Sequence, residues 1–171
     1  MDVRNLNKPK VDAAVDQMNA SRLDALKLRA GLIFHADATA PITEANATDA
    51  STTSALVLVL RSRYITHIAS ACNATSGVGS HMAADATNVV TVAVPTNEAG
   101  EILTVNELKA LFNSHRASTT FHPVADSTNV ISAADATNTA SLRTLANALK
   151  TGFNAHFAAA MSAAALVVVN P

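Results

Sequence analysis

The chain has 171 residues and a formal net charge of −1, with 15% charged and 49% apolar residues, many of them alanine. This charge balance offers no basic face for phosphate contacts, so we do not expect nucleic-acid binding. The single cysteine, Cys72, has no partner for an internal disulfide, which suits assembly in a reducing cytoplasm. The apolar run 157–169 is shorter than the roughly 20 residues of a transmembrane helix, so we expect no membrane span.

The first 33 residues are expected to form an arm (1–10) followed by a leading helix (11–33). Apolar residues at Val11, Val15 and Met18 recur at the spacing of one helix face. After this helix the composition changes to Ala, Asp, Thr and Asn, and internal repeats begin.

The repeats are clearest between 81–121 and 122–162, where 17 of 41 aligned residues are identical, which indicates duplication of one structural unit. An earlier copy aligns at an offset of 48, and the extra residues fit a flexible insert within 68–80. We therefore divide a single domain into repeat 1 (34–80), repeat 2 (81–121), repeat 3 (122–157) and an apolar tail (158–171).

Each repeat is expected to consist of a non-helical arm and a helix. The arms are rich in Thr, Val, Asp and Asn, which favour extended backbone and turns. The helices are predicted at 51–68, 98–116 and 139–160, each preceded by a good N-cap residue: Asp49, Asn97 and Asn138. Leu108, Phe112 and His115 share one helix face, which should be buried, and Leu149, Phe153 and His156 repeat it.

The predicted fold is mainly α: four helices joined by long extended Thr/Ala/Asp-rich arms. An arm of 15 residues can span roughly 50 Å, whereas an 18-residue helix is about 27 Å long. Each arm can therefore run back along the preceding helix, so that successive helices are parallel. The run Val89–Val94 favours short β pairing. An antiparallel bundle with short loops is the alternative.

Five histidines occupy aligned positions in the repeats, at helix ends or arm starts: His67, His81, His115, His122 and His156. Parallel helices would gather them, together with His35, at one end of the domain. We expect them to cap helix carbonyls and to border the core. A metal site formed by the five is the alternative. The Asp-x-Thr motifs at Asp37, Asp85, Asp126 and Asp135 are expected to form turns, and no catalytic or cofactor-binding residue is predicted.

The arm-plus-helix pattern resembles a repeat found in virion structural proteins of tailed bacteriophages. In those proteins, runs such as His-x-Ala-Asp-Ala-Thr-Asn-x-Val-Thr precede a helix ending in Leu-Lys-x-x-Phe/Tyr-Asn-x-His. Residues 84–91 with 108–115, and 125–132 with 149–156, match this pattern. The resemblance covers about 34–157, although repeat 1 departs from it at Ala40-Pro41 and at 63–67. It implies a component of the head, neck or tail of the particle, with no catalytic residues.

The expected function is therefore that of a non-enzymatic virion protein, assembled in the host cytoplasm in multiple copies and docked on another virion protein. A host-surface adhesin or receptor-binding fibre module is the alternative, and a small metal-binding enzyme is a third. Contacts with a second copy or another virion protein are expected at two apolar runs: Val89, Val90, Val92, Val94, Leu166, Val167, Val168 and Val169.

Overall fold

A computed structural model describes residues 17–18, 37, 41–71, 81–122 and 125–159. The chain divides into two units, Met1–Ile33 and Phe34–Pro171. In the first unit, Gln17 and Met18 are helical, and the rest of the expected leading helix lies outside the described residues. The second unit contains the three repeats and is described below.

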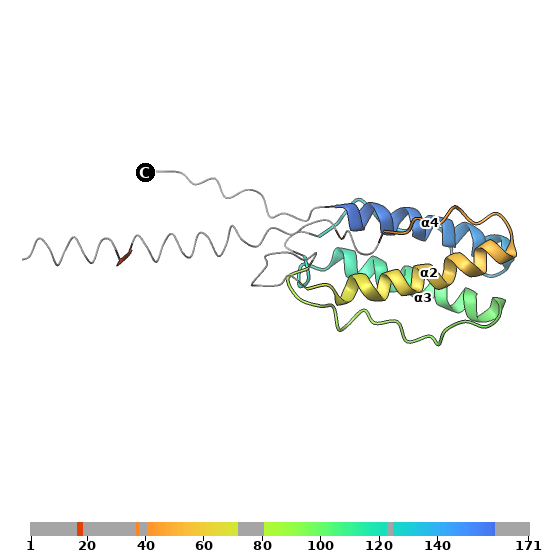
Figure 1. Cartoon of the computed structure of the whole chain (residues 1–171), viewed down its shortest axis with the longest axis horizontal. Coiled ribbons are helices and arrows are strands. Elements are labelled where there is room, and N and C mark those ends of the chain that lie inside the picture. Colours follow the sequence, from red (N-terminus) through yellow and green to blue (C-terminus); the bar gives the residue numbers. More distant parts are fainter. Residues whose placement is uncertain (1–16, 19–36, 38–40, 72–80, 123–124, 160–171) are drawn as a thin grey trace, which may run out of the picture. The chain divides into compact units, whose positions relative to one another are not determined.

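The second unit is mainly α, as predicted (Figure 1). Its helices are α2 (Ala50–Ala69), α3 (Glu98–Ala117) and α4 (Thr139–Ala158). These bounds agree with the predicted ones to within two residues. The described residues contain no β-strand, so the β pairing expected at Val89–Val94 is not found there.

Each helix begins at the residue that the sequence indicates. The side chains of Asp49, Asn97 and Asn138 accept hydrogen bonds from backbone N–H groups in the first turns of α2, α3 and α4. In α2 and α4 the third helical residue returns a bond to the cap, which completes a capping box. These bonds satisfy N–H groups that have no partner within the helix.

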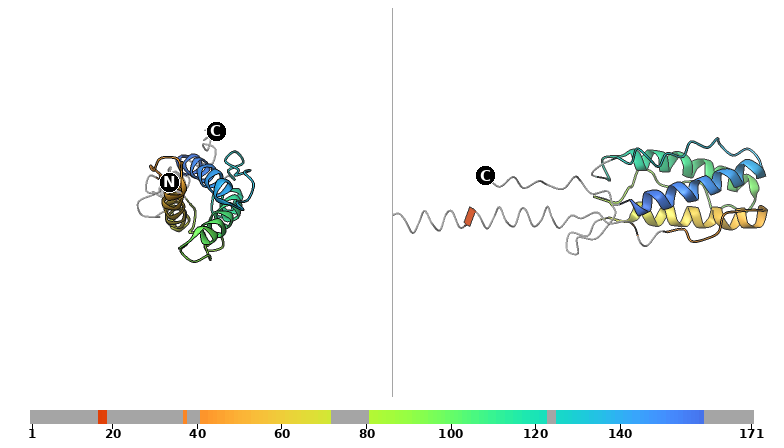
Figure 2. Two further views of the ribbon diagram at one scale, coloured as in Figure 1. Left: turned by 90° about the vertical axis from the view of Figure 1, so that its right-hand side faces the viewer. Right: turned by 90° about the horizontal axis from the view of Figure 1, so that it is seen from above.

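The three helices run in the same direction around a common axis (Figures 1 and 2). Their first turns line one shallow hollow, which includes Ala50 of α2, Glu98 of α3 and Thr139 of α4. Their last turns bring three histidines together at the opposite end. This arrangement rules out the antiparallel bundle for this part of the chain.

Asparagine side chains hold two connecting segments against the helices. Asn154 of α4 accepts a hydrogen bond from the Ile42 N–H (2.8 Å) and donates one to the Ile42 carbonyl (2.9 Å). Asn147 makes the same pair of bonds with Ala47. On α3, Asn113 and Asn106 bind the backbone of Ile131 and Ala136 in the same way. Segment 41–47 therefore lies antiparallel along α4, and 131–136 lies antiparallel along α3.

The segment between α2 and α3 is held by different side chains. Glu107 of α3 accepts hydrogen bonds from the backbone N–H groups of Thr91 and Val92. From α2, Arg61 donates to the Val92 carbonyl and the Tyr64 hydroxyl donates to the Asn88 carbonyl. These side-chain bonds take the place of the strand partner that the sequence suggested for this run.

The repeated Leu/Phe/His face is the core, as predicted. Leu108, Phe112, Leu149 and Phe153 are completely buried, and the Phe112 and Phe153 ring centroids are 4.7 Å apart. Tyr64 occupies the equivalent position in α2, and its ring centroid lies 5.6 Å from that of Phe153. One aromatic ring from each helix therefore meets at the axis.

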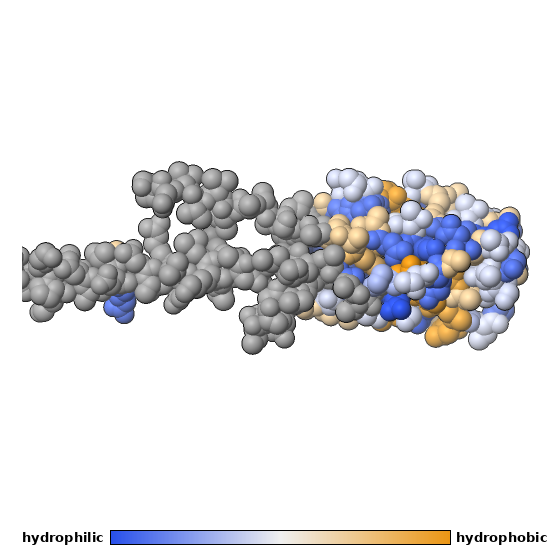
Figure 3. Space-filling view, turned by 45° about the horizontal axis from the view of Figure 1, so that its top comes forward, coloured by the Kyte–Doolittle hydropathy of each residue, from blue (hydrophilic) through white to orange (hydrophobic). Residues whose placement is uncertain are grey.

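The outer surface mixes hydrophilic residues with small apolar areas (Figure 3). Val89 and Val94 are exposed, whereas Val90 is part of the core and Val92 is half-buried. The other expected contact run, 166–169, lies outside the described residues. Among the described helices, none is both long and apolar enough to cross a membrane.

Candidate metal centre

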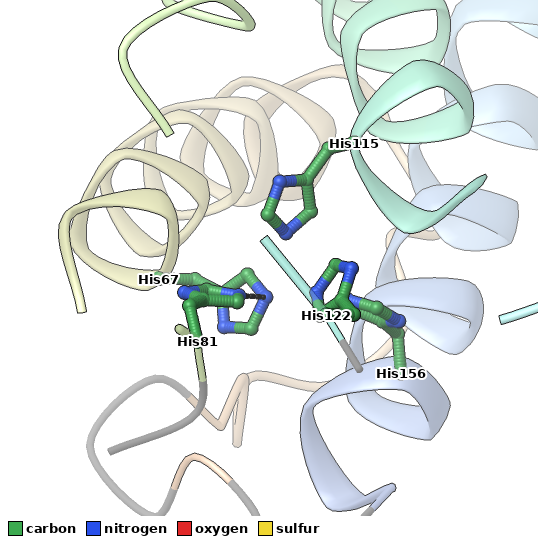
Figure 4. A group of neighbouring side chains, drawn as sticks. All are labelled: His67, His81, His115, His122 and His156. Carbon is green, nitrogen blue, oxygen red and sulfur yellow. Dashed lines mark hydrogen bonds between the residues drawn. The ribbon is translucent and has the colours of Figure 1, made fainter. Parts of the chain in front are cut away.

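Five histidine side chains meet where the three helices end (Figure 4). His67, His115 and His156 come from the last turns of α2, α3 and α4, and His81 and His122 come from the segments that follow α2 and α3. One ring nitrogen of each lies within 4.8 Å of the others. We call these five residues the histidine cluster. His35, the expected sixth member, lies outside the described residues.

The helix periodicity places three of the rings. His115 follows Leu108 and Phe112 on the same face of α3, so the packing that buries Phe112 also turns the His115 ring toward the axis. His67 and His156 hold the equivalent positions in α2 and α4. The cluster therefore forms the last layer of the core, below the aromatic rings.

A carboxylate lies behind each helix histidine. Nδ1 is 2.9 Å from an Asp Oδ2 in the pair His67–Asp37, and 2.8 Å in the pairs His115–Asp85 and His156–Asp126. The two partners are 30 residues apart in every pair. All six side chains are almost completely buried.

Each of these aspartates also joins two helices. Its side chain binds the histidine of the helix that follows, and its backbone N–H donates to a carbonyl at the end of another helix. The three equivalent backbone bonds are Asp37 to Phe157 (2.7 Å), Asp85 to Ile68 (2.8 Å) and Asp126 to Arg116 (2.8 Å). The first repeat thus binds the last helix, so the three repeats form a closed ring.

The expected Asx turns form at Asp85 and Asp126. Oδ1 of Asp85 accepts hydrogen bonds from the backbone N–H groups of Thr87 and Asn88, which leaves Oδ2 for His115 and the Asn88 amide. Asp126 has the same set of bonds. Asp135 differs, because its carboxylate pairs with Lys109 at 2.7 Å.

The remaining two histidines point their Nδ1 atoms at backbone carbonyls. Nδ1 of His81 lies 2.6 Å from the carbonyl of Ser70, the C-cap of α2, and Nδ1 of His122 lies 3.2 Å from that of Ser118, the C-cap of α3. The capping role expected of the helix histidines is therefore filled by the two arm histidines. The helix histidines bind carboxylates instead.

The Nε2 atoms face the interior of the cluster. Nε2 of His67 and Nε2 of His81 are 3.1 Å apart. Nε2 of His115, His122 and His156 are buried and have no hydrogen-bond partner among the described residues. Unpaired buried nitrogen atoms are uncommon in folded proteins, so their convergence is the distinctive feature of the site.

Burial keeps the histidine rings neutral, and hydrogen bonds keep the carboxylates of Asp85 and Asp126 ionised. Burial lowers the pKa of His81 to about 3 and of His156 to about 3, and it also depresses the pKa of His67 and His122. Burial opposes ionisation of Asp85, but hydrogen bonds from Asn88, His115 and Thr87 hold its pKa below the usual range. Neutral imidazole is the form that binds metal ions.

The aspartates are the part of the site that sequence reasoning missed. Turn formation already explained Asp85 and Asp126, and no carboxylate lies within one helix turn of His67, His115 or His156 in the sequence. The constant Asp-to-His spacing of 30 residues, present in all three repeats, is the feature of the sequence that points to these pairs.

The arrangement suits binding better than catalysis. All five rings are at most 2% exposed, so a substrate cannot reach them without opening the helix ends. Structural metal sites are closed in this way, whereas catalytic sites keep a position open.

Comparison of the chain with models of known protein families, with curated proteins and with solved structures finds no match.

Proposed function

We propose that the chain is a non-enzymatic structural component of a tailed-bacteriophage virion, present in multiple copies and docked on another virion protein. The observation that carries the proposal is that the repeated polar side chains form hydrogen bonds within the unit itself. The repeated Asp, Asn and His side chains bind one another or the backbone of this unit. Polar groups used in this way hold a scaffold together, as expected for a repeat protein.

The resemblance to virion repeats supports the assignment to a particle. The residues that carry it have structural roles here: Asp85 and Asp126 join helices, and Asn113 and Asn154 hold the connecting segments. Under this proposal the segment 11–33 forms a fourth helix, and the chain is assembled in the host cytoplasm before it enters the virion.

The proposed contact surface includes exposed apolar side chains at equivalent places in two repeats. Val89 is 46% exposed and its counterpart Val130 is 47% exposed. Val94, five residues after Val89, is 59% exposed. These side chains and the tail 158–171 are proposed to contact a second copy or a neighbouring virion protein.

Quantitative mass spectrometry of purified particles tests the proposal. Particles assembled from the genome that encodes the chain should contain it in a fixed number of copies relative to the major capsid protein. Deleting 160–171 or introducing Val89→Asp with Val94→Asp should leave the helical circular dichroism unchanged and release the protein into the soluble fraction. A matched Thr66→Ala variant, on the exposed side of α2, should be incorporated normally.

Two results would count against the proposal. If the unaltered chain stays in the soluble fraction while particles are complete, the chain is not a virion component. If particles carry the chain, and those without it assemble normally but no longer adsorb to host cells, the adhesin alternative is correct.

A further inference from the structure

The protonation of the histidine cluster follows from its outer partners. Both carboxylate oxygens of Asp85 and of Asp126 already accept hydrogen bonds from N–H groups, so each faces its histidine as an acceptor, and Nδ1 of His115 and of His156 carries the proton. The backbone carbonyls facing His81 and His122 are also acceptors, so their Nδ1 atoms are protonated too. The same holds for His67 beside Asp37. A neutral ring has one N–H, so every Nε2 presents a lone pair to the interior.

Lone pairs gathered without a donor repel one another in a buried site. The Nε2 atoms of His67 and His81 are only 3.1 Å apart, and neither has a proton to share in this tautomer. The Nε2 atoms of His115, His122 and His156 have no hydrogen-bond partner within the part of the chain that the structure describes. Leaving several buried acceptors unsatisfied is strongly unfavourable. A cation bound among them would satisfy all five at once.

The spacing of the nitrogens fits a single ion. Metal–imidazole bonds are about 2.0–2.1 Å long, which places neighbouring donors of a six-coordinate ion about 3.0 Å apart and opposite donors about 4.2 Å apart. The Nε2 atoms of His67 and His81 are 3.1 Å apart, and the ligand nitrogens of the five histidines all lie within 4.8 Å of one another. A slight contraction of the cluster would bring all five to bonding distance.

The outer shell has the composition of known metal sites. Histidine ligands commonly donate their second N–H to a carboxylate or a backbone carbonyl, which orients the ring and increases its basicity. Here three rings contact carboxylates and two contact carbonyls. The negative charges of Asp85 and Asp126 favour a positive ion at the centre. A donor set made only of imidazole selects a first-row transition metal over magnesium or calcium.

We propose that the histidine cluster is a structural site for one divalent first-row transition-metal ion, bound by the Nε2 atoms of His67, His81, His115, His122 and His156. The ion links the ends of all three helices and the two arms that follow α2 and α3. It thereby holds the ring of repeats closed. The positions of the histidines in the sequence favour purely structural roles, whereas the convergence of five Nε2 atoms in the fold favours a metal site.

The first experiment measures metal in the full chain, purified without an affinity tag. Inductively coupled plasma mass spectrometry should find about one transition-metal ion per chain. Removing it with dipicolinate should lower the melting temperature by about 10 °C or more, because the ion binds only the folded chain. One equivalent of Zn²⁺, Fe²⁺, Co²⁺ or Ni²⁺ should restore it. X-ray absorption of the loaded protein should show a nitrogen shell at about 2.1 Å with the scattering pattern of imidazole.

The second experiment uses variants that separate binding from folding. His122→Gln and His156→Gln should each weaken Ni²⁺ binding by at least about tenfold, the scale seen when even an outer partner of a ligand is lost. Asn147→Ala is the matched control, since this residue binds the Ala47 backbone more than two helical turns before His156. It should lower the melting temperature but keep one ion per chain and the full shift on chelation.

Clear outcomes would overturn the proposal. One is an unaltered chain that is purified without metal and whose melting temperature does not respond to any of the four ions. Another is an absorption spectrum that shows fewer than four imidazole nitrogens. A third is equal Ni²⁺ affinity in the unaltered chain and both histidine variants. If the variants fail to fold, the metal content and the spectrum of the unaltered chain decide.

Discussion

Removal of the Asn154 amide tests whether side chains hold the connecting segments in place. Asn154 binds both the N–H (2.8 Å) and the carbonyl (2.9 Å) of Ile42, a residue 112 positions away whose side chain is in the core. Asn154→Ala removes both bonds and leaves two main-chain groups without their partner. Segment 41–47 would then keep the hydrogen bonds from Asn147 to Ala47 and from Lys150 to Asn46.

The expected loss follows from the number of bonds and their surroundings. Each hydrogen bond contributes about 0.5–1.5 kcal/mol net, and a buried group left unpaired costs about 1–3 kcal/mol. Because Asn154 is half-buried, water can reach part of the vacated space, which limits the penalty. We therefore expect a decrease of about 2–3 kcal/mol in the free energy of unfolding.

Urea unfolding followed by circular dichroism measures this loss, with the metal concentration held constant because bound ligand shifts apparent stability. Asn113→Ala breaks the equivalent contact with Ile131 and should give a similar loss. Thr151→Ala is the control, since Thr151 is exposed and its hydroxyl bonds only within α4. A loss for Asn154→Ala as small as that of the control, below about 0.5 kcal/mol, would refute the reasoning.

Three further predictions follow from the core, the outer shell and the buried histidines. Phe153→Ala should lower the free energy of unfolding by about 3–5 kcal/mol, because its ring is completely buried; calorimetry showing a loss typical of an exposed residue would contradict the described core. Asp85→Asn should weaken Co²⁺ binding in a titration by about 10- to 100-fold without changing its stoichiometry, and an unchanged affinity would show that Asp85 does not support the His115 ligand. In the presence of a chelator, the free energy of unfolding should decrease as the pH falls from 6.5 toward 3. Histidines of the unfolded chain bind protons in this range, whereas His81 and His156 of the folded chain stay neutral until about pH 3. Each such histidine contributes up to about 1.4 kcal/mol per pH unit, and urea unfolding that is independent of pH in this window would contradict the neutral cluster.

Local sequence patterns were sufficient to predict α2, α3 and α4 and their buried face. Asp49, Asn97 and Asn138 mark the helix starts because a capping bond involves only the next few residues. Phe112 and Phe153 are identified as core residues by helical spacing alone. These predictions depend only on the order of residues within one helix, which can be read from the sequence.

The partners of the connecting segments could not be predicted, because they are residues far away in the sequence. Val89–Val94 has the composition of a strand, yet its backbone groups bind Glu107 and Arg61. Alternating valines cannot distinguish a neighbouring strand from a neighbouring helix with suitable side chains. The Asp–His pairs were missed for a related reason, since partners 30 residues apart meet only through the path of the arm.

The contact between segment 41–47 and α4 has a consequence for how the chain folds. In an open solenoid each repeat needs only its neighbour, so folding can begin anywhere and spread, and repeats can be gained or lost. Here the first repeat finds its partner 100–112 residues later, on the last helix. During synthesis the first two repeats therefore cannot complete the ring until the third repeat has been made. Contacts between residues so far apart in the sequence make this last folding step slow. The same closure fixes the number of repeats, because a fourth would have no free edge to join.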